Sequence, residues 1–274
     1  MRCCMLSGYI DAHVHLFPWR LQNAIYNWFL KEQWSLAYAG KRAEELLALL
    51  ARWGAARIVG CHYAHKPGIA TSLNAWLLQL TQTWPQIIPL ATLHPDDPAL
   101  RTAAEHCLNQ GFAGFKVHCA VQMISPADSR LWPLYETAIE YDRPVLIHAG
   151  TAPHPSPVLG VDHFKQLMKR YPCLKMQVAH LGMWEWEAFL ALTEKYERLY
   201  FDTAAITDRH MGFPQDRLRS VLITYQDRII FGSDLPIMEG TYPDFVQHFL
   251  ALDLPEEVWQ KLFHDNAARL YNIR

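Results

Sequence analysis

Short apolar runs recur along the chain, and most are separated by stretches whose apolar residues follow a helical spacing. Eight runs are rich in β-branched or other apolar residues and predict strands over residues 9–13, 56–61, 87–93, 113–118, 144–148, 174–179, 199–202 and 228–231. Between them, apolar residues repeat at helical intervals, for example over residues 43–51 and 131–139. The pattern therefore predicts eight strand–helix units.

Strands and helices that alternate at roughly 25 to 30 residues per unit imply parallel strands joined by right-handed crossovers. Eight such units can close into an α/β fold of the (β/α)8 TIM-barrel type, and 274 residues suit one such domain, so we expect residues 1–274 to form a single barrel domain. An open doubly wound sheet competes with this interpretation. It fits less well because no glycine-rich phosphate loop follows the first strand.

Two segments depart from this rhythm. Residues 16–40, an extra segment after the first strand, are rich in aromatic residues and would lie over the mouth of the barrel. They form either a lid over a substrate or an extra helix packed against the barrel. The second is the tail, where Pro255 and two glutamates open a C-terminal helix that runs toward Tyr271 and should cap the outer ring of helices.

The charge balance and the segments between charges narrow the class of partner. With 25 Lys and Arg against 27 Asp and Glu, the chain has no global field to attract nucleic acid or an anionic membrane, so we expect a small-molecule substrate. The first ten residues leave no room for a signal peptide. The longest uncharged run, residues 144–161, contains too much His and Pro for a membrane helix.

The six cysteines contain no CxxC pair, and we interpret the adjacent Cys3 and Cys4 as incidental rather than as a metal site. A chain of this length needs no disulfides to fold, so a soluble protein of the reducing cytoplasm is expected. Ten tryptophans leave room for an aromatic interface, and a homo-oligomer therefore stays open.

The string Asp11-Ala12-His13-Val14-His15 carries the first candidate chemistry. Alternate side chains of a strand share a face, so His13 and His15 should point into the barrel together as a pair of metal ligands. For an isolated HxH string, the alternative is two histidines whose hydrogen bonds are satisfied within the core.

Three other strand ends carry a residue that can bind a metal. The fifth predicted strand ends at His148, the sixth is followed by His180, and the eighth is followed by Asp234. Because the carboxyl ends of barrel strands meet in one pocket, these residues should converge with the two histidines of the first strand. Three imidazoles and a carboxylate suit a divalent transition metal: Zn²⁺ is the first choice, with Fe²⁺, Mn²⁺ and Co²⁺ as alternatives.

These motifs together resemble the amidohydrolase superfamily, in particular its amidohydrolase-related branch, which also holds the aminocarboxymuconate-type decarboxylases. The resemblance spans nearly the whole chain. Besides HxH, it rests on residues 114–118 (GFKVH), 146–151 (LIHAGT), 179–182 (AHLG), 200–203 (YFDT), 231–236 (FGSDLP) and 266–271 (NAARLY). It implies a metal-dependent enzyme on a barrel, without specifying the substrate.

Carried over residue by residue, the resemblance implies that His13, His15, His148 and Asp234 bind the metal, with one ion per chain favoured over two. Asp234 would also accept a proton when a metal-activated water attacks the substrate. His180 would act as an acid or base beside the ion, the favoured role, or join a second metal.

Other polar residues near the strand ends keep alternative interpretations. Lys116 could bridge two metals as a carboxylated lysine, pair with a substrate carboxylate, or extend out of the pocket. His118 lies two residues further on the same strand face and is expected to contact the substrate. Asp202 either orients a ligand histidine or caps the next segment of the chain. His94 is interpreted as structural, and the histidines given no special role are His62, His65, His154, His163 and His248.

We consider three functions as hypotheses. The first is a hydrolase that uses a metal-activated water on a small-molecule amide, ester or lactone. The second is a nonoxidative decarboxylase of an aromatic or muconate-like acid, with the aromatic segment over residues 17–38 as its cover and Lys116 or Arg209 as the partner of the substrate carboxylate. The third is a barrel that binds a ligand without catalysis.

Overall fold

Eight parallel strands form the sheet, hydrogen-bonded in chain order from first to last. The structure is a computed structural model that describes residues 8–153 and 155–273, so Cys3, Cys4 and His154 lie outside the described residues. The strands are β1 Tyr9–His15, β2 Ala55–Cys61, β3 Ile87–Thr92, β4 Gly114–His118, β5 Val145–His148, β6 Met176–Val178, β7 Leu199–Asp202 and β8 Ile229–Ile230. Each overlaps a predicted strand, which confirms the (β/α)8 barrel.

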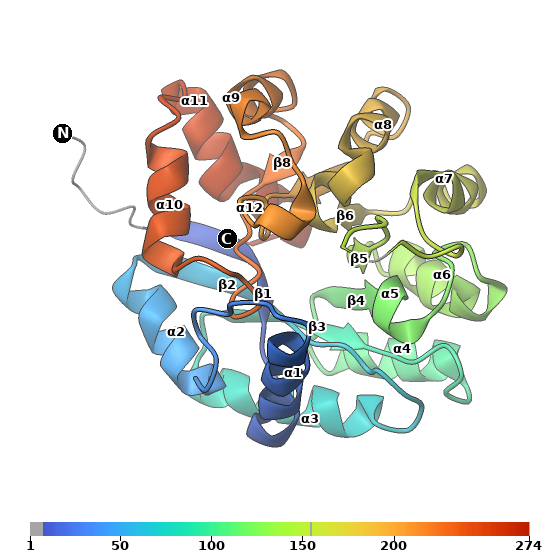
Figure 1. Cartoon of the computed structure of the whole chain (residues 1–274). Helices are drawn as coiled ribbons and strands as arrows, with labels where there is room; N and C mark the ends of the chain where they lie inside the picture. The colour runs from blue at the N-terminus through green and yellow to red at the C-terminus, as the bar shows by residue number, and fades with distance from the viewer. Residues whose placement is uncertain (1–7, 154, 274) are drawn as a thin grey trace.

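Helices surround the sheet on its outside (Figure 1). They are α1 Trp19–Lys31, α2 Ala43–Arg52, α3 Ala70–Thr83, α4 Leu100–Asn109, α5 Cys119–Gln122, α6 Trp132–Glu140, α7 Val161–Arg170, α8 Trp186–Leu190, α9 Gln215–Thr224, α10 Tyr242–Leu250, α11 Glu256–Gln260 and α12 Asn266–Tyr271. Short 3-10 segments are η1 Ser129–Leu131, η2 Ala179–Glu185, η3 Ala191–Glu194 and η4 Arg209–Met211, and η5 Lys261–Asp265 is a π-helical turn. Among the described residues, no helix is both long and apolar enough to cross a membrane.

The buried apolar residues form one core outside the barrel and a smaller one inside it. The outer core packs the helices onto the strands; α2, for example, buries Leu46, Leu47 and Leu50 at helical spacing. The inner core holds residues from the barrel strands together with three residues of α12: Ala267, Leu270 and Tyr271. The tail thus does more than cap the outer ring: α12 closes one end of the barrel, and Figure 1 places it near the centre of the ring.

Residues 16–40 form α1 and an irregular return toward α2. Three of their apolar side chains are buried in a small cluster that is separate from the two cores: Tyr26, Trp34 and Leu36. Their partners in the cluster come from the loops that follow β5, β6, β7 and β8, namely Ala152, Met183, Ala205, Met211 and Ile237. The segment is therefore a packed cover over one side of the barrel mouth, as the second of the two interpretations requires.

β1 and β8 meet without a regular ladder, and separate backbone hydrogen bonds join them. The amide of Ala12 donates to the carbonyl of Phe231 at 2.9 Å, and the amide of Asp234 donates to the carbonyl of His13 at 2.9 Å. A close approach at Gly232 makes this possible, because a Cβ at that position would lie 2.9 Å from the Cβ of His13. The closure of the barrel thus depends on a residue without a side chain.

Replacing Gly232 with alanine should therefore destabilise the protein by roughly 1–3 kcal/mol, since the strand junction must open to admit a methyl group. Urea unfolding measures the change. Gly240→Ala is the matched control, because a Cβ at Gly240 meets no atom within 4 Å. Equal stability of the two variants would contradict the close-packed junction.

Candidate metal centre

A bulge in β1 sets the direction of its two histidines. The register pairs Asp11 with Ile58 but Val14 with Gly60, so β1 carries one extra residue between these pairs. Ala12 packs in the inner core, whereas the next residue, His13, also faces inward, which regular alternation would not allow. His15 follows on the same side, with its ring centroid 5.0 Å from that of His13. The bulge thus brings both histidines to the barrel mouth.

Asp234 and Lys116 lie beside these histidines. One oxygen of Asp234, Oδ1, lies 3.2 Å from Nε2 of His15 and 3.4 Å from Nε2 of His13. The Nζ atom of Lys116, from β4, lies 2.9 Å from the same Nε2 of His13. All four side chains are buried. The first and last strands and the middle of the sheet therefore meet at one point, as convergence of the strand ends requires.

Asp202, the last residue of β7, accepts hydrogen bonds from His13 and from groups next to it. Its Oδ2 accepts hydrogen bonds from Nδ1 of His13 at 3.0 Å and from Nε2 of Gln177 at 2.7 Å. Its Oδ1 accepts from the backbone amides of His180 at 2.8 Å and Ala204 at 3.1 Å. Because a carboxylate only accepts, the proton of the His13 ring lies on Nδ1 and its Nε2 presents a lone pair to the mouth.

His180 follows β6 with a left-handed backbone (φ 58°), which is rare for a residue with a side chain. Its Nδ1 lies 2.8 Å from the carbonyl oxygen of Ala204, so Nδ1 carries the proton and Nε2 is free to accept. Asp234 also has a left-handed backbone (φ 71°). The chain holds both residues in an unfavourable conformation that aims their side chains at the centre.

His148 and His118 form the other side of the mouth. Their rings stack with centroids 4.1 Å apart, and the ring of His148 lies 5.2 Å from that of His180. Tyr63 packs its ring edge against His118 at 4.8 Å and against His15 at 5.5 Å. The histidines predicted from the strand ends therefore surround one space, and Tyr63 joins them. In the sequence, the one feature that indicates Tyr63 is its place two residues after the end of β2.

Burial governs the protonation of the centre. It lowers the pKa of His13, and the positive charge of Lys116 adds to this effect. Burial also holds the pKa of His15 and of His148 well below the ordinary value. Neutral imidazoles are the form that binds metals. Burial raises the pKa of Asp234, while His180 and His13 oppose this by their charge.

The group of acceptors has the character of a cation site. Oδ1 of Asp234 is buried and has no hydrogen-bond partner, although two imidazole nitrogens lie within 3.4 Å of it. Ligand-type atoms of His13, His180 and Asp234 all lie within 4.8 Å of one another. The Lys116 ammonium reaches Nε2 of His13 but does not hydrogen-bond Oδ1 of Asp234, and a buried acceptor without a donor is costly unless a cation or a bound water satisfies it. The residues present therefore fit a divalent metal.

Cys61, at the end of β2, adds a soft ligand-type atom that the sequence interpretation did not include. Its Sγ lies 3.7 Å from Nδ1 of His15, and His13, His15 and Cys61 also fall within the same 4.8 Å limit. Burial raises the pKa of the Cys61 thiol to about 12. Because this Nδ1 faces away from the Asp234 oxygen, Cys61 contacts the far side of the His15 ring.

The remaining predicted residues lie away from this group or are locally satisfied. Nδ1 of His94 accepts from the amide of Asp96 at 3.2 Å, in keeping with a structural histidine. Arg209 is largely exposed and pairs with Glu239 at 3.1 Å, and His210 stacks on Trp34 of the cover. Arg209 thus points toward solvent and Glu239 rather than toward the centre.

His62 was given no special role, as a surface or loop histidine; it lies in the loop directly after β2 but not on the surface. It is fully buried, and its Nε2 lies 3.0 Å from Oδ1 of Asn74. Asn74 in turn bonds the backbone of Thr92 in β3. Local sequence contains no indication of this partner, because the contact joins the end of β2 to a helix and a strand further along the chain.

His62 should make stability depend on pH. Burial lowers its pKa from 6.5 to about 3, so the unfolded chain binds a proton more readily than the folded one between these values. Stability should therefore fall as the pH drops from about 6.5 toward 3. In His62→Gln, the loss of unfolding free energy between pH 7 and pH 5 should be smaller by about 2 kcal/mol. Denaturant titrations at both pH values measure it, with His106→Gln at an exposed helix position as the control.

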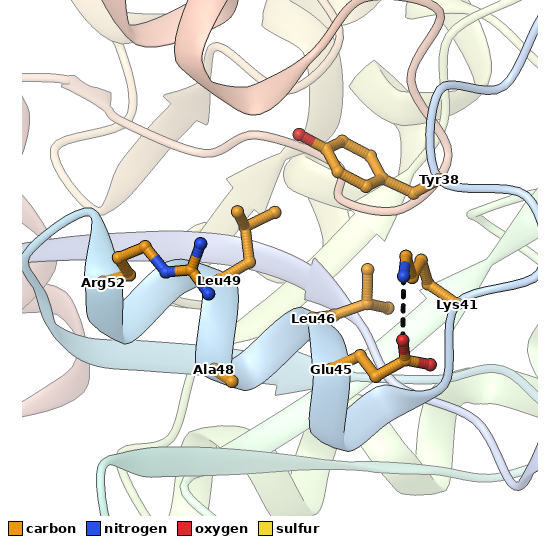
Figure 2. A pocket seen from close by; sticks show the side chains of 7 residues that line it. All are labelled: Tyr38, Lys41, Glu45, Leu46, Ala48, Leu49 and Arg52. Carbon is orange, nitrogen blue, oxygen red and sulfur yellow. Dashed lines mark hydrogen bonds and ion pairs between the residues drawn. The ribbon is translucent and has the colours of Figure 1, made fainter.

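A pocket on the outside of the barrel is separate from this centre. It is lined by Tyr38, Lys41, Glu45, Leu46, Ala48, Leu49 and Arg52. Figure 2 shows Tyr38 facing α2 across it, and Lys41 paired with Glu45 at 2.9 Å. None of the predicted site residues lines it. The pocket is therefore not part of the candidate metal centre.

Comparison with known proteins places the chain among relatives of the same architecture. The sequence model of a family described as amidohydrolase matches residues 10–273. No curated protein matches the chain. Among solved structures, a 2,6-dihydroxybenzoate decarboxylase in complex with 2,6-dihydroxybenzoate superposes with a TM-score of 0.74 at 18% identity, over 98% of this chain and 100% of that one.

Two further solved structures show the range of activities on this fold. A dihydroxybenzoic acid decarboxylase from Polaromonas sp. JS666, with bound manganese and the inhibitor 2-nitroresorcinol, has a TM-score of 0.73 at 17% identity and covers 98% of both chains. A candidate 2-pyrone-4,6-dicarboxylic acid hydrolase from Pseudomonas putida has a TM-score of 0.67 at 20% identity, over 97% and 98%. At such identities the structural likeness shows the fold, whereas the family match spans nearly the whole chain. The chain belongs to the amidohydrolase family.

Proposed function

We propose that the protein is a metal-dependent hydrolase of a small-molecule amide, ester or lactone, with one divalent ion held by His13, His15, His148 and Asp234. The observation that carries the proposal is the buried Oδ1 atom of Asp234, which lacks a hydrogen-bond partner and lies within 3.4 Å of two imidazole nitrogens. Lys116 brings a positive charge near this carboxylate, but a buried oxygen without a hydrogen-bond donor is still costly unless a cation or water binds beside it.

The donor set favours a transition ion over Mg²⁺ or Ca²⁺, because three of the four ligands are imidazoles. Zn²⁺ remains the first choice, and Mn²⁺ gains weight because decarboxylases of this fold are described with bound manganese. When bound, the ion would lower the pKa of a coordinated water toward neutrality and polarise a substrate carbonyl.

The protein's own groups would divide the proton transfers. Asp234 accepts the proton released by the attacking water, because its carboxylate lies beside the imidazoles that would hold the ion. His180 keeps Nε2 free while Nδ1 donates to the Ala204 carbonyl, so in its neutral form it takes up a proton before it can deliver one to a leaving group. His118 and Tyr63 form the wall against which the substrate lies.

Lys116 would have to move when the ion binds. Its Nζ lies 2.9 Å from Nε2 of His13, the nitrogen that would coordinate the ion. We propose that it then pairs with an anionic group of the substrate. The alternative, a carboxylated Lys116 that bridges two ions, predicts two metals per chain. Elemental analysis that gives one ion per chain would exclude the bridge.

A second candidate function is nonoxidative decarboxylation of an aromatic or muconate-like acid. It is favoured by the described activities of two of the structural neighbours, which are decarboxylases of dihydroxybenzoates. Of the two basic groups that this reaction could use, Arg209 pairs with Glu239 and points away from the centre, whereas Lys116 lies within it. Decarboxylation therefore remains the alternative to the first proposal, and the products decide between the two functions.

A cytoplasmic location also remains our proposal. Within the described ranges, Cys61, Cys107, Cys119 and Cys173 are free thiols. Free thiols are the usual state in a reducing compartment.

The experiment that separates the two functions uses protein loaded with Zn²⁺ or Mn²⁺ and compares two product assays. Hydrolysis of lactone and ester panels releases acid that a pH-stat records, and hydrolysis of an amide panel releases ammonia or an amine that a colorimetric assay records. Decarboxylation of dihydroxybenzoates and muconate-like acids instead releases carbon dioxide. Acid, ammonia or amine release without carbon dioxide supports the hydrolase. Carbon dioxide release reverses the order of the proposals, and full activity after exhaustive chelation contradicts both.

A further inference from the structure

The junction between β1 and β8 carries three of the four proposed ligands, yet it is the least regular part of the barrel. β8 contains only Ile229–Ile230, and no regular ladder pairs it with β1. Ladder hydrogen bonds normally fix the separation of neighbouring strands. Here single backbone bonds, such as that from the Asp234 amide to the His13 carbonyl at 2.9 Å, join the two segments, so a side chain that also spans the junction would add to their fixed separation.

Asp11 occupies this position. Its Oδ1 accepts hydrogen bonds from two backbone amides: that of Ser233 at 3.0 Å and that of His13 at 3.3 Å. Ser233 directly precedes Asp234, so this single oxygen joins the two backbone segments that carry the ligands. The side chain is fully buried on the outer side of the strand, away from the barrel mouth. Asp11 therefore touches none of the proposed ligand side chains.

The second oxygen of Asp11 is held in turn. Its Oδ2 accepts from the hydroxyl of Tyr242 in α10 at 3.1 Å, and that hydroxyl lies 2.6 Å from the hydroxyl of Tyr9. The two tyrosines fix the plane of the carboxylate, so the direction of Oδ1 is set by α10 as well as by β1. A buried carboxylate is costly to desolvate, and it persists where several donors depend on it.

We propose that Asp11 is a positioning residue for the metal centre: it fixes the separation of the His13 and Asp234 segments through their backbone amides. This inference rests on the proposed metal-binding function. The mechanism depends on an acceptor atom at the position of Oδ1, and the negative charge of Asp11 is not what it requires. It therefore predicts opposite outcomes for an uncharged isostere and for a longer acid.

In Asp11→Asn the amide oxygen can still accept from both backbone amides, while the amide nitrogen donates to the Tyr242 hydroxyl. We expect a metal dissociation constant within about 3-fold of the wild type, since the outer contacts survive. Asp11→Glu keeps the charge but moves the oxygens by one methylene, and Asp11→Ala removes them. Both should weaken metal binding by at least about 10-fold, the range typical of lost outer-shell partners.

The dissociation constant is measured by titrating metal-free protein with Zn²⁺ in competition with a chromophoric chelator, so that activity is not needed. Absorption spectra of the Co²⁺-loaded variants report whether the ligand geometry changes. Asp162→Asn and Asp162→Glu, at an exposed position of α7, are the matched controls, and their affinities should equal that of the wild type. Tyr242→Phe removes only the hydroxyl contact to Oδ2, so it should weaken binding less than Asp11→Glu does.

The outcomes separate the inference from the function on which it rests. If the wild-type protein binds no metal, the proposed function fails. If the wild type binds metal while Asp11→Glu matches it and Asp11→Asn does not, charge rather than positioning is the role of Asp11 and the inference is overturned. Because the decision rests on the Asn and Glu variants, it stands even where Asp11→Ala does not fold.

Discussion

Asp234→Asn should be folded, should keep part of its metal affinity, and should lose turnover by about three orders of magnitude, within the range that a positioned acid or base contributes. The amide is nearly the same size as the carboxylate but is a far weaker proton acceptor, so the attacking water loses its base. The remaining oxygen can still face the imidazoles that lie within 3.4 Å.

The measurement pairs kcat on the best substrate of the panel with metal content per chain. Asp162→Asn serves as the control, because Asp162 is an exposed residue of α7 that pairs with Lys165. Full activity in Asp234→Asn would rule out this residue as the proton acceptor. If the variant loses activity only in proportion to the metal that it loses, Asp234 is a ligand and not the proton acceptor.

Asp202→Asn should have the second largest effect, a loss of metal affinity of about 10- to 100-fold without loss of the fold. Asp202 accepts four hydrogen bonds, from side chains of His13 and Gln177 and from the amides of His180 and Ala204. An asparagine can accept the two backbone bonds with its oxygen, but its amide nitrogen then faces two donors.

The conflict is relieved when the His13 ring moves its proton from Nδ1 to Nε2, which removes the lone pair that would bind the metal. Nitrogen-15 NMR of the histidine rings distinguishes the two tautomers, and chelator competition gives the affinity. Asp202→Ala should in addition lose about 3–5 kcal/mol of stability, because it leaves buried donors without an acceptor. An unchanged tautomer together with weakened binding would show that Asp202 acts in some other way.

The carboxylate of Asp202 also makes the stability of the protein depend on pH. Burial raises the pKa of Asp202, but the proximity and hydrogen bond of His13 outweigh this effect and hold that pKa below its ordinary value of 3.8. Its contribution to stability is therefore complete above that value and is lost as the pH falls below it. Acid destabilisation through His62 begins at a higher pH, so the two effects are separable along one titration.

Local pattern was enough for the elements and for most of the residues that point into the mouth. Strands of β-branched and apolar residues at regular intervals predicted all eight strands, and several strand ends pointed to a polar residue of the mouth, as at His148, whereas Cys61 and Tyr63 near the end of β2 were missed. This works because a barrel converts position along the chain into position in space: every strand points the same way, so its last residue faces the same pocket.

The pattern allowed Asp202 to orient one of the ligand histidines, but it left open which residues far apart in the chain meet. His13 bonds Asp202 across 189 positions, and Lys116 reaches His13 across 103. Such pairs depend on how the barrel closes and on which rotamer each side chain adopts, and local periodicity contains no information on either. The same reason explains the burial of His62 and the insertion of α12 into the end of the barrel.

The barrel, the order of its strands and most of the polar residues near their carboxyl ends could thus be predicted, because they depend on hydrophobic periodicity and strand direction. The bulge that turns His13 inward, the tautomers imposed by Asp202 and Ala204, and the backbone bonds of Asp11 across the β1–β8 junction could not. Those features arise where two segments meet after folding, and each is fixed by a partner that is distant in the chain.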